Sequence, residues 1–129
     1  MSTISRNHPT RKEIAITFLK LAASGRVREA YEKVAPDFRH HNPYFRGDAE
    51  SLSKGMAENA AKFPDKVLEV LRVLEDGDLV AVHSRVRLHP GERGIALVHI
   101  FRFRNDAVVE LWDLGQPVPE DSPNEYGMF

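Results

Sequence analysis

The residue best suited to acid/base chemistry is His99, which lies in the apolar run Gly94–Arg104. An imidazole with an ordinary pKa of about 6.5 can take up and release a proton near neutral pH. The alternative is a core histidine that only forms hydrogen bonds with Ser84 or Glu69. Both interpretations place His99 on a buried face, where a polar group without a partner costs about 1–3 kcal/mol.

His41 and Asn42 are further candidates, in the non-periodic segment Asp37–Gly47. Loops carry functional side chains more often than strands do, so both residues could form part of a pocket wall. Asn42 can instead stabilise the Asn-Pro turn, because Pro43 forces the preceding residue towards an extended conformation. His40 alternates with His41, so we expect one of these two rings to point outwards.

A metal site is not favoured by the sequence. The six histidines show no pair at the i, i+4 spacing of a helical metal site, and no acidic residue is suitably spaced to assist them. A site could arise only if distant residues converge in three dimensions. The absence of cysteine excludes a disulfide framework, thiolate ligands and a cysteine nucleophile.

The composition is that of one globular domain. Of the 129 residues, 42% are apolar and 29% charged, which argues against disorder. The 18 Lys and Arg balance 19 Asp and Glu, so a dedicated binder of nucleic acid or of membrane surfaces is not expected. No run approaches the roughly 18 apolar residues of a membrane span, and residues 1–10 lack the apolar core of a signal peptide. We therefore expect a cytoplasmic, single-domain protein over residues 1–129, with irregular ends at about 1–9 and 117–129.

Three helices are expected ahead of the strands. The first begins at the capping box Thr10–Glu13 and ends at Gly25. A short second helix covers about Val27–Val34. Asp48 caps the third, and Pro64 ends it.

Four strands should follow, because the remaining runs are rich in Val, Ile, Leu and Phe and are separated by typical hairpin residues. The expected strands cover 66–75, 79–88, 94–104 and 107–116. Three helices followed by an antiparallel meander predict an α+β fold in which the helices cover one face of a curved sheet.

The strand register decides which side chains meet. Pairing the more apolar faces sets Ser84 opposite His99. A two-residue turn at Asn105-Asp106 then sets Trp112 opposite His99, and a similar turn in the preceding hairpin sets Glu69 opposite Ser84. One β-bulge would flip every residue beyond it. The concave face predicted in this way also carries Glu110, Leu114 and Gln116.

The convex face carries a basic stripe made of His83, Arg85, Arg87 and Arg102. Four cations without interleaved aromatic residues are weak evidence of a nucleic-acid or phosphate site. A homodimer interface with acidic partners is the favoured interpretation of this face.

With these elements in place, the chain resembles the nuclear transport factor 2-like superfamily of cone-shaped α+β domains, and within it the SnoaL-like polyketide cyclase and aldol-condensation-type proteins. The residues that carry the resemblance are the loop His41-Asn42-Pro43, the run His99–Phe103, the strand Val109–Asp113 and the terminal Gly127-Met128-Phe129. The resemblance covers nearly the whole chain. It implies a hydrophobic cavity between sheet and helices, acid/base chemistry without a cofactor in enzymatic members, and dimerisation through the outer sheet face.

Within this superfamily, the resemblance to ketosteroid isomerases is incomplete. Those proteins carry a Tyr on the first helix, an Asp before the loop proline and an Asp before the Phe-x-Phe of the third strand. The aligned positions here are Phe18, Asn42 and His99, so isomerisation by that mechanism is not expected. SnoaL-like cyclases commonly use an Asp as the acid/base in the cavity, and the position that best matches it here is again His99.

We therefore expect a small cofactor-independent enzyme that removes a proton next to the carbonyl of a hydrophobic compound, followed by aldol cyclisation, isomerisation or hydration. The carbonyl itself accepts the electrons, so neither a metal nor an organic cofactor is required. The alternatives are a non-catalytic small-molecule binder and a dimeric structural module. The expected catalytic residues are His99, His41 and Asn42. The expected substrate contacts are Phe18, Tyr31, Tyr44, Glu69, Ser84, Phe101, Trp112 and Gln116, and the expected lids of the cavity are Tyr44, Phe45, Tyr126 and Phe129.

Overall fold

The computed structural model describes residues 8–129. The expected irregular N-terminal end therefore lies mostly outside the described residues. In chain order the elements are α2 (Arg11–Ala23), α3 (Val27–Ala30), the 3-10 turn η1 (Tyr31–Lys33), β1 (Val34–His40), α4 (Ala49–Lys62), β2 (Val67–Asp76), β3 (Leu79–Arg87), β4 (Ile95–Arg104) and β5 (Ala107–Pro117).

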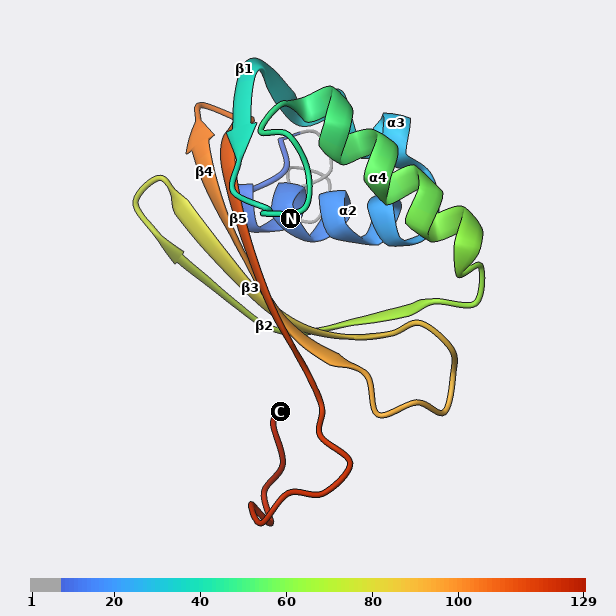
Figure 1. The fold of residues 1–129 in the computed structure, drawn as a ribbon. Helices are drawn as coiled ribbons and strands as arrows, with labels where there is room; N and C mark the ends of the chain where they lie inside the picture. The colour runs from blue at the N-terminus through green and yellow to red at the C-terminus, as the bar shows by residue number, and fades with distance from the viewer. Residues whose placement is uncertain (1–7) are drawn as a thin grey trace.

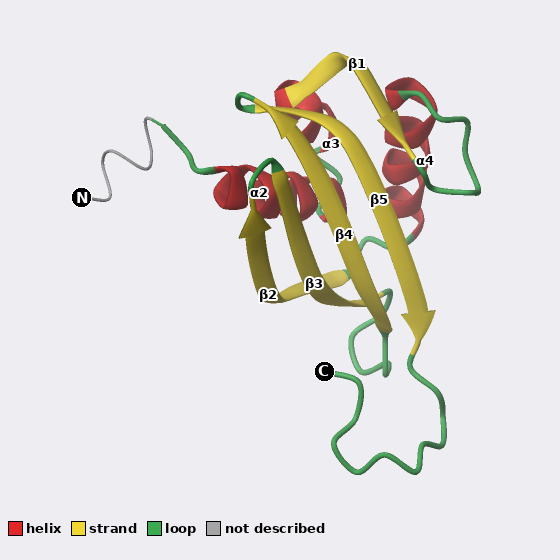
Figure 2. Cartoon of the chain, turned by 90° about the vertical axis from the view of Figure 1, so that its left-hand side faces the viewer, coloured by secondary structure: helices red, strands yellow, loops and turns green. Residues whose placement is uncertain are grey.

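The five strands form one sheet in the order β1-β5-β4-β3-β2. Strands β2 to β5 make the expected antiparallel meander, and β1 adds a parallel strand beside β5. The sheet curves, and α2 and α4 lie over one of its faces (Figure 1). The side view shows the same two-layer arrangement, with the C-terminal segment leaving the sheet beyond β5 (Figure 2). The α+β fold with helices on one face of a curved sheet is confirmed.

Local side chains begin both long helices as predicted. At α2 the Thr10 hydroxyl accepts a hydrogen bond from the Glu13 amide at 3.1 Å, and the Glu13 carboxylate accepts one from the Thr10 amide at 2.8 Å. At α4 the Asp48 carboxylate accepts from the Ser51 amide at 2.9 Å. These bonds satisfy amides that have no partner inside the helix.

The segment between α3 and α4 differs from the prediction of a helix over Val27–Val34. The helix ends at Ala30, and β1 begins at Val34 after one 3-10 turn. Pro36 lies inside β1, which is an edge strand whose register with β5 shifts between Val34 and Arg39. A proline is tolerated at an edge because its missing amide faces no neighbouring strand.

A β-bulge in β5 overturns the predicted register of the last hairpin. The two-residue turn at Asn105-Asp106 forms, but Arg102 pairs with Glu110, which leaves Val109 unpaired. All residues beyond Val109 therefore point to the opposite face. His99 pairs with Asp113 instead of Trp112. The prediction that the concave face carries Glu110, Trp112, Leu114 and Gln116 is wrong, since all four lie on the outer face.

The first hairpin also differs. Its turn is Gly77-Asp78, and a register shift after Val70 sets Val70 opposite Ser84 and Glu69 opposite Arg85. The predicted position of Glu69 in the concave row is therefore wrong. Between β3 and β4 the register moves by two residues, so that His99 pairs with Val82 and keeps the predicted face.

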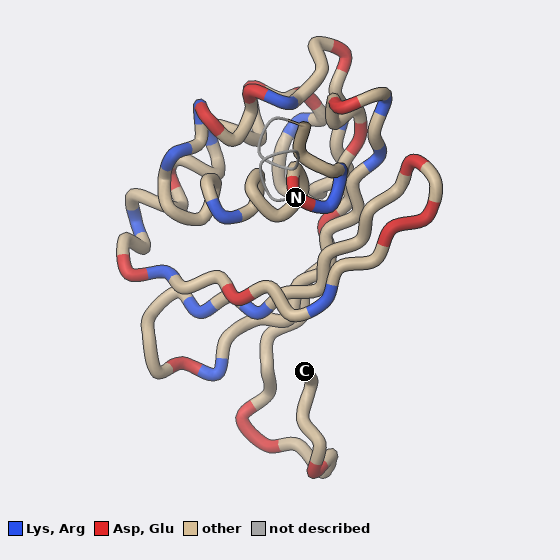
Figure 3. The backbone as a smooth tube through the Cα atoms, turned by 180° about the vertical axis from the view of Figure 1, so that it is seen from behind, with Lys and Arg blue, Asp and Glu red and all other residues tan. Residues whose placement is uncertain are grey.

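The core lies between the helices and the concave face, called the inner face below. Phe101 and Val82 are fully buried there, and Phe18 from α2 meets Phe101 edge-to-face at 5.6 Å between ring centroids. Burying a side chain of this size stabilises the fold by about 1.5–3 kcal/mol. Basic and acidic residues are interspersed along the helices, hairpins and loops (Figure 3). No helix in residues 8–129 is both long and apolar enough to span a bilayer.

Candidate functional site

A cavity of about 360 Å³ lies between α2, α4, the loop after β1 and the inner face of the sheet. Its volume falls in the range of small-molecule sites. The polar exceptions to a mostly apolar lining are Asn42, Asn59, Lys66, His99 and Asp113. The apolar part consists of Leu19, Ala22, Ala23, Phe45, Leu52, Gly55, Met56, Leu68, Val86, Leu88, Ile95 and Leu97.

Three of these polar side chains come together from different elements. His99 and Asp113 are paired neighbours on β4 and β5 and share the inner face. The Asn42 side chain donates a hydrogen bond from Nδ2 to Asp113 Oδ2 at 2.9 Å, and its Oδ1 accepts from the Tyr44 amide at 2.9 Å. Asn42 therefore both lines the cavity and builds the turn, the two roles that the sequence left open.

Unpartnered polar atoms mark this part of the molecule. Asp113 Oδ1, His99 Nδ1 and Ser84 Oγ are buried without a hydrogen-bond partner among the described residues. Leaving a buried donor or acceptor unpaired costs about 1–3 kcal/mol, and charged groups cost more. Because Asp113 and His99 also line the cavity, a bound ligand could supply their missing partners.

Burial controls the charge of the histidine. Desolvation lowers the pKa of His99 to about 4, although the nearby Asp113 carboxylate opposes this by favouring the imidazolium. At neutral pH the ring is therefore neutral and offers one N–H donor and one acceptor. It can donate to a developing oxyanion, whereas its low pKa makes it a weaker base than an ordinary histidine.

Tyr31 lies beside the same site. Desolvation and, second, the Asp113 charge raise the pKa of the Tyr31 phenol well above its usual value, so the hydroxyl stays protonated. It donates to Met56 Sδ at 3.3 Å, and its ring packs 5.2 Å from that of Phe18.

His41 lies outside this cavity. It is on the outer sheet face, where Nε2 is 2.6 Å from Glu110 Oε2 and the ring stacks on Trp112 at 5.0 Å. Arg39 and Arg102 approach the same Glu110 carboxylate at 3.2 and 3.5 Å. The hydrogen bond from His41 and then the one from Arg39 lower the pKa of Glu110. These five residues are called the outer-face cluster below, and three of them, His41, Arg102 and Trp112, border a separate hollow of about 280 Å³.

The other predicted site residues are dispersed. Phe18, Ser84 and Phe101 are core residues, and none of them borders the cavity. Tyr44 is 86% exposed, while Glu69 and Gln116 are exposed and belong to the outer face. Of the predicted site residues the structure therefore brings His99 and Asn42 to the cavity wall, with Tyr31 close by.

Of the residues expected to cover the cavity mouth, some border the cavity and others lie away from it. Phe45 borders the cavity, with its ring against Gly55 of α4. Tyr126 is 85% exposed. Phe129 packs on the outer face, with its ring centroid 4.7 Å from the Arg85 guanidinium.

Sequence reasoning missed three polar residues of the cavity, Asn59, Lys66 and Asp113. The two-residue turn at Asn105-Asp106 set Trp112 opposite His99, and strict alternation without a bulge then puts its neighbour Asp113 on the outer face. The adjacent apolar pair Val108-Val109 interrupts that alternation and was the available signal.

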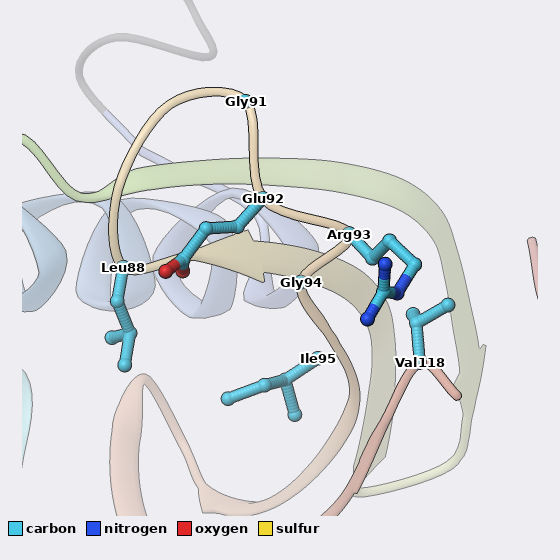
Figure 4. A pocket seen from close by; sticks show the side chains of 7 residues that line it. All are labelled: Leu88, Gly91, Glu92, Arg93, Gly94, Ile95 and Val118. Atoms are coloured by element: carbon cyan, nitrogen blue, oxygen red, sulfur yellow. The ribbon is translucent and has the colours of Figure 1, made fainter. Parts of the chain in front are cut away.

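A further hollow, of about 330 Å³, lies at the loop between β3 and β4. It contains none of the predicted site residues (Figure 4). Arg85 supports this loop by donating to the Arg93 carbonyl from Nε at 2.9 Å and from Nη2 at 2.7 Å. Within residues 8–129, no group of three or more His, Asp and Glu side chains is arranged to hold a metal ion.

Comparison with known proteins agrees with this architecture. The model of the SnoaL-like domain family matches residues 15–111, which is most of the chain. The chain belongs to the SnoaL-like domain family. No curated protein matches this SnoaL-like chain.

Several solved structures are similar to this SnoaL-like protein. AclR from Streptomyces galilaeus, a proposed hydroxylase, is 25% identical with a TM-score of 0.71 over 82% of this chain and 88% of its own. A loop-truncation variant of IdmH is 26% identical, with a TM-score of 0.68 over 83% and 93%. A proposed polyketide cyclase from Acidithiobacillus ferrooxidans is 15% identical, with a TM-score of 0.67 over 84% and 90%, and so supports the fold alone.

Proposed function

We propose that this SnoaL-like protein is a cofactor-independent acid/base enzyme acting on a hydrophobic carbonyl compound in the cavity. The observation that carries the proposal is the unpartnered pair at the cavity wall, Asp113 Oδ1 and His99 Nδ1. A protein that only stored an apolar ligand would need neither a buried carboxylate nor an unpaired imidazole.

The chemistry follows from the state of each group. Asp113 Oδ1 removes a proton from the carbon next to the substrate carbonyl, and the C–H electron pair moves onto the carbonyl oxygen. Asn42 holds the other carboxylate oxygen at 2.9 Å and so fixes the direction of attack. Neutral His99 donates its N–H to the developing enolate oxygen.

The second half of the reaction returns the proton. The enolate carbon can attack a second carbonyl of the same molecule, which closes a ring and leaves an alkoxide to be protonated. Where the enolate is conjugated with a C=C bond, the far carbon of that dienolate can be protonated instead, which moves the double bond and isomerises the substrate. In both cases the protonated Asp113 gives its proton back, and the enzyme ends unchanged. His41, a candidate from the sequence, has no part in this proposal because it lies in the outer-face cluster.

A non-catalytic binding module is the competing proposal, and the mostly apolar lining favours it. An exchange assay with a simple ketone distinguishes an enzyme from a binding module. In D₂O at pH 7, 1-tetralone should exchange the hydrogens next to its carbonyl faster with the protein than in buffer, as followed by proton NMR. A base on one side of a chiral cavity should also exchange one of the two hydrogens first. Exchange at the buffer rate, with binding intact, would favour the binding module.

We also propose that the protein forms a homodimer through the outer sheet face. Leu74 and Leu114, both on this face, are 70% and 66% exposed, and exposed apolar surface that gathers on one face is a feature of protein–protein interfaces. The basic stripe beside them is partly neutralised, since Arg102 pairs with Asp78 at 2.9 Å. Sedimentation should give a dimer for the wild type and a smaller species for Leu114→Glu. A wild-type monomer at high concentration would exclude the dimer.

A further inference from the structure

Lys66 gives the cavity a positive charge that the proposed proton transfer does not use. It lies in the turn between α4 and β2 and is half-buried. Its amide donates to the Phe63 carbonyl at 3.1 Å, which fixes the backbone of the turn. Among the described residues that line the cavity, it is the only lysine or arginine.

The Lys66 ammonium has no counterion in the described part of the chain. Its Nζ donates to Asn59 Oδ1, and no carboxylate oxygen of residues 8–129 lies within 4.0 Å of it. An ammonium carries three donors, so the neutral amide leaves capacity for an acceptor from outside. Burial lowers the pKa of Lys66, which is the expected effect of desolvating a cation without a charged partner.

The cation lies away from the proton-transfer residues along the cavity. Leu68 follows Lys66 by two residues and pairs with Val86, which pairs with Ile95, so these three lining residues mark the Lys66 end of the cavity floor. On β4, His99 lies four residues beyond Ile95, which at about 3.4 Å per residue is on the order of 13 Å. The cavity thus has a carboxylate and a neutral imidazole towards one end, apolar walls, and an ammonium towards the other.

We infer that Lys66 binds an oxyanion on the ligand, at the end remote from the reacting carbonyl. The substrate class is then an amphipathic acid with a ring-containing apolar body and a carboxylate or a similar oxyanion at one end. The assignment of the reacting end rests on the proposed function, whereas the contact between Lys66 and the oxyanion does not.

Two fluorescent molecules with the same anilinonaphthalene body test the contact. One is 8-anilino-1-naphthalenesulfonate, which carries an oxyanion, and the other is neutral N-phenyl-1-naphthylamine. The variant Lys66→Met should bind the sulfonate about tenfold more weakly and the neutral molecule within about twofold of the wild type, because only the charge is removed. Lys66→Arg should retain most of the affinity for the sulfonate.

Exposed Lys54 of α4 provides the matched control, since Lys54→Met removes one positive charge from outside the cavity. It should leave the binding of both molecules unchanged. Near-ultraviolet circular dichroism checks that each variant keeps its packing, because loosely packed proteins bind the sulfonate unspecifically. The inference is overturned if Lys66→Met binds the sulfonate as the wild type does, if both molecules weaken equally, or if the wild type fails to bind the sulfonate.

Sulfonate binding by Lys66→Met and hydrogen exchange into 1-tetralone together distinguish a failure of the oxyanion site from a failure of the proposed acid/base function. Unchanged sulfonate binding by Lys66→Met together with stereospecific exchange of 1-tetralone would overturn the ligand class and leave acid/base catalysis standing. Selective loss of sulfonate binding without any exchange activity would support the oxyanion site and count against catalysis.

Discussion

Acidification should destabilise this protein through His99. Its pKa is about 4 in the folded chain, because burial disfavours the imidazolium, and about 6.5 in the unfolded chain. Between these two values the unfolded state binds more protons, so the free energy of unfolding falls as the pH drops from 6.5 towards 4. The contribution is intact above pH 6.5. Its full size is about 3 kcal/mol, and about 2 kcal/mol of it is already lost at pH 5.

The assay is urea unfolding of the wild type and of His99→Gln at pH 7.5 and pH 5. Gln is neutral at both values, so the wild type should lose about 2 kcal/mol more than the variant on acidification. The carboxyls of Asp37, Asp48 and Glu110 also have lowered pKa values, from hydrogen bonds that they accept, but they are present in both proteins and cancel.

His8→Gln, at an exposed histidine, is the matched control and should follow the wild type. Equal acid sensitivity of the wild type and His99→Gln would refute the reasoning, because it would mean that the folded protein accepts a proton on His99 without cost.

Two glycines give further predictions. In Gly55→Ala the new methyl group overlaps the Phe45 ring, which is 41% exposed and can swing away. Thermal melting of Gly55→Ala should therefore show an unchanged stability or one up to about 1 kcal/mol higher. Stopped-flow fluorescence should show that N-phenyl-1-naphthylamine is released faster than from the wild type. Slower release would contradict the role of Phe45 as a cover of the cavity. Gly94 has φ +92°, and a Cβ there would lie 2.6 Å from the Val86 carbonyl oxygen, so Gly94→Ala should cost about 2 kcal/mol or more in urea unfolding. Gly91→Ala, at φ +91° in open space, should cost less, and equal losses would exclude the steric contribution.

The helices and the meander could be predicted because their signals are local. The capping box at Thr10 and the cap at Asp48 depend on residues three positions apart, and both formed as expected. Strand β1 could not be predicted in this way. Its place is set by pairing with β5, some 70 residues further along the chain, and Pro36 disguises it.

The site was only partly predictable for a related reason. A buried face on β4 is fixed by alternation, so His99 could be placed on the inner side from sequence. Asp113 could not, because the bulge at Val109 exchanges the two faces of β5 and brings in a carboxylate where Trp112 was expected. One unpaired residue thus decides whether the cavity contains a base.

The proposed catalysis depends most on Asp113, the group that moves the proton. The decisive measurement is the rate of hydrogen exchange into 1-tetralone by Asp113→Asn, relative to the wild type and to Asp106→Asn at an exposed turn. Removing a general base should slow exchange about 100-fold or more, with Asp106→Asn unchanged. An Asp113→Asn protein that is folded and exchanges at the wild-type rate would contradict the proposed role of Asp113.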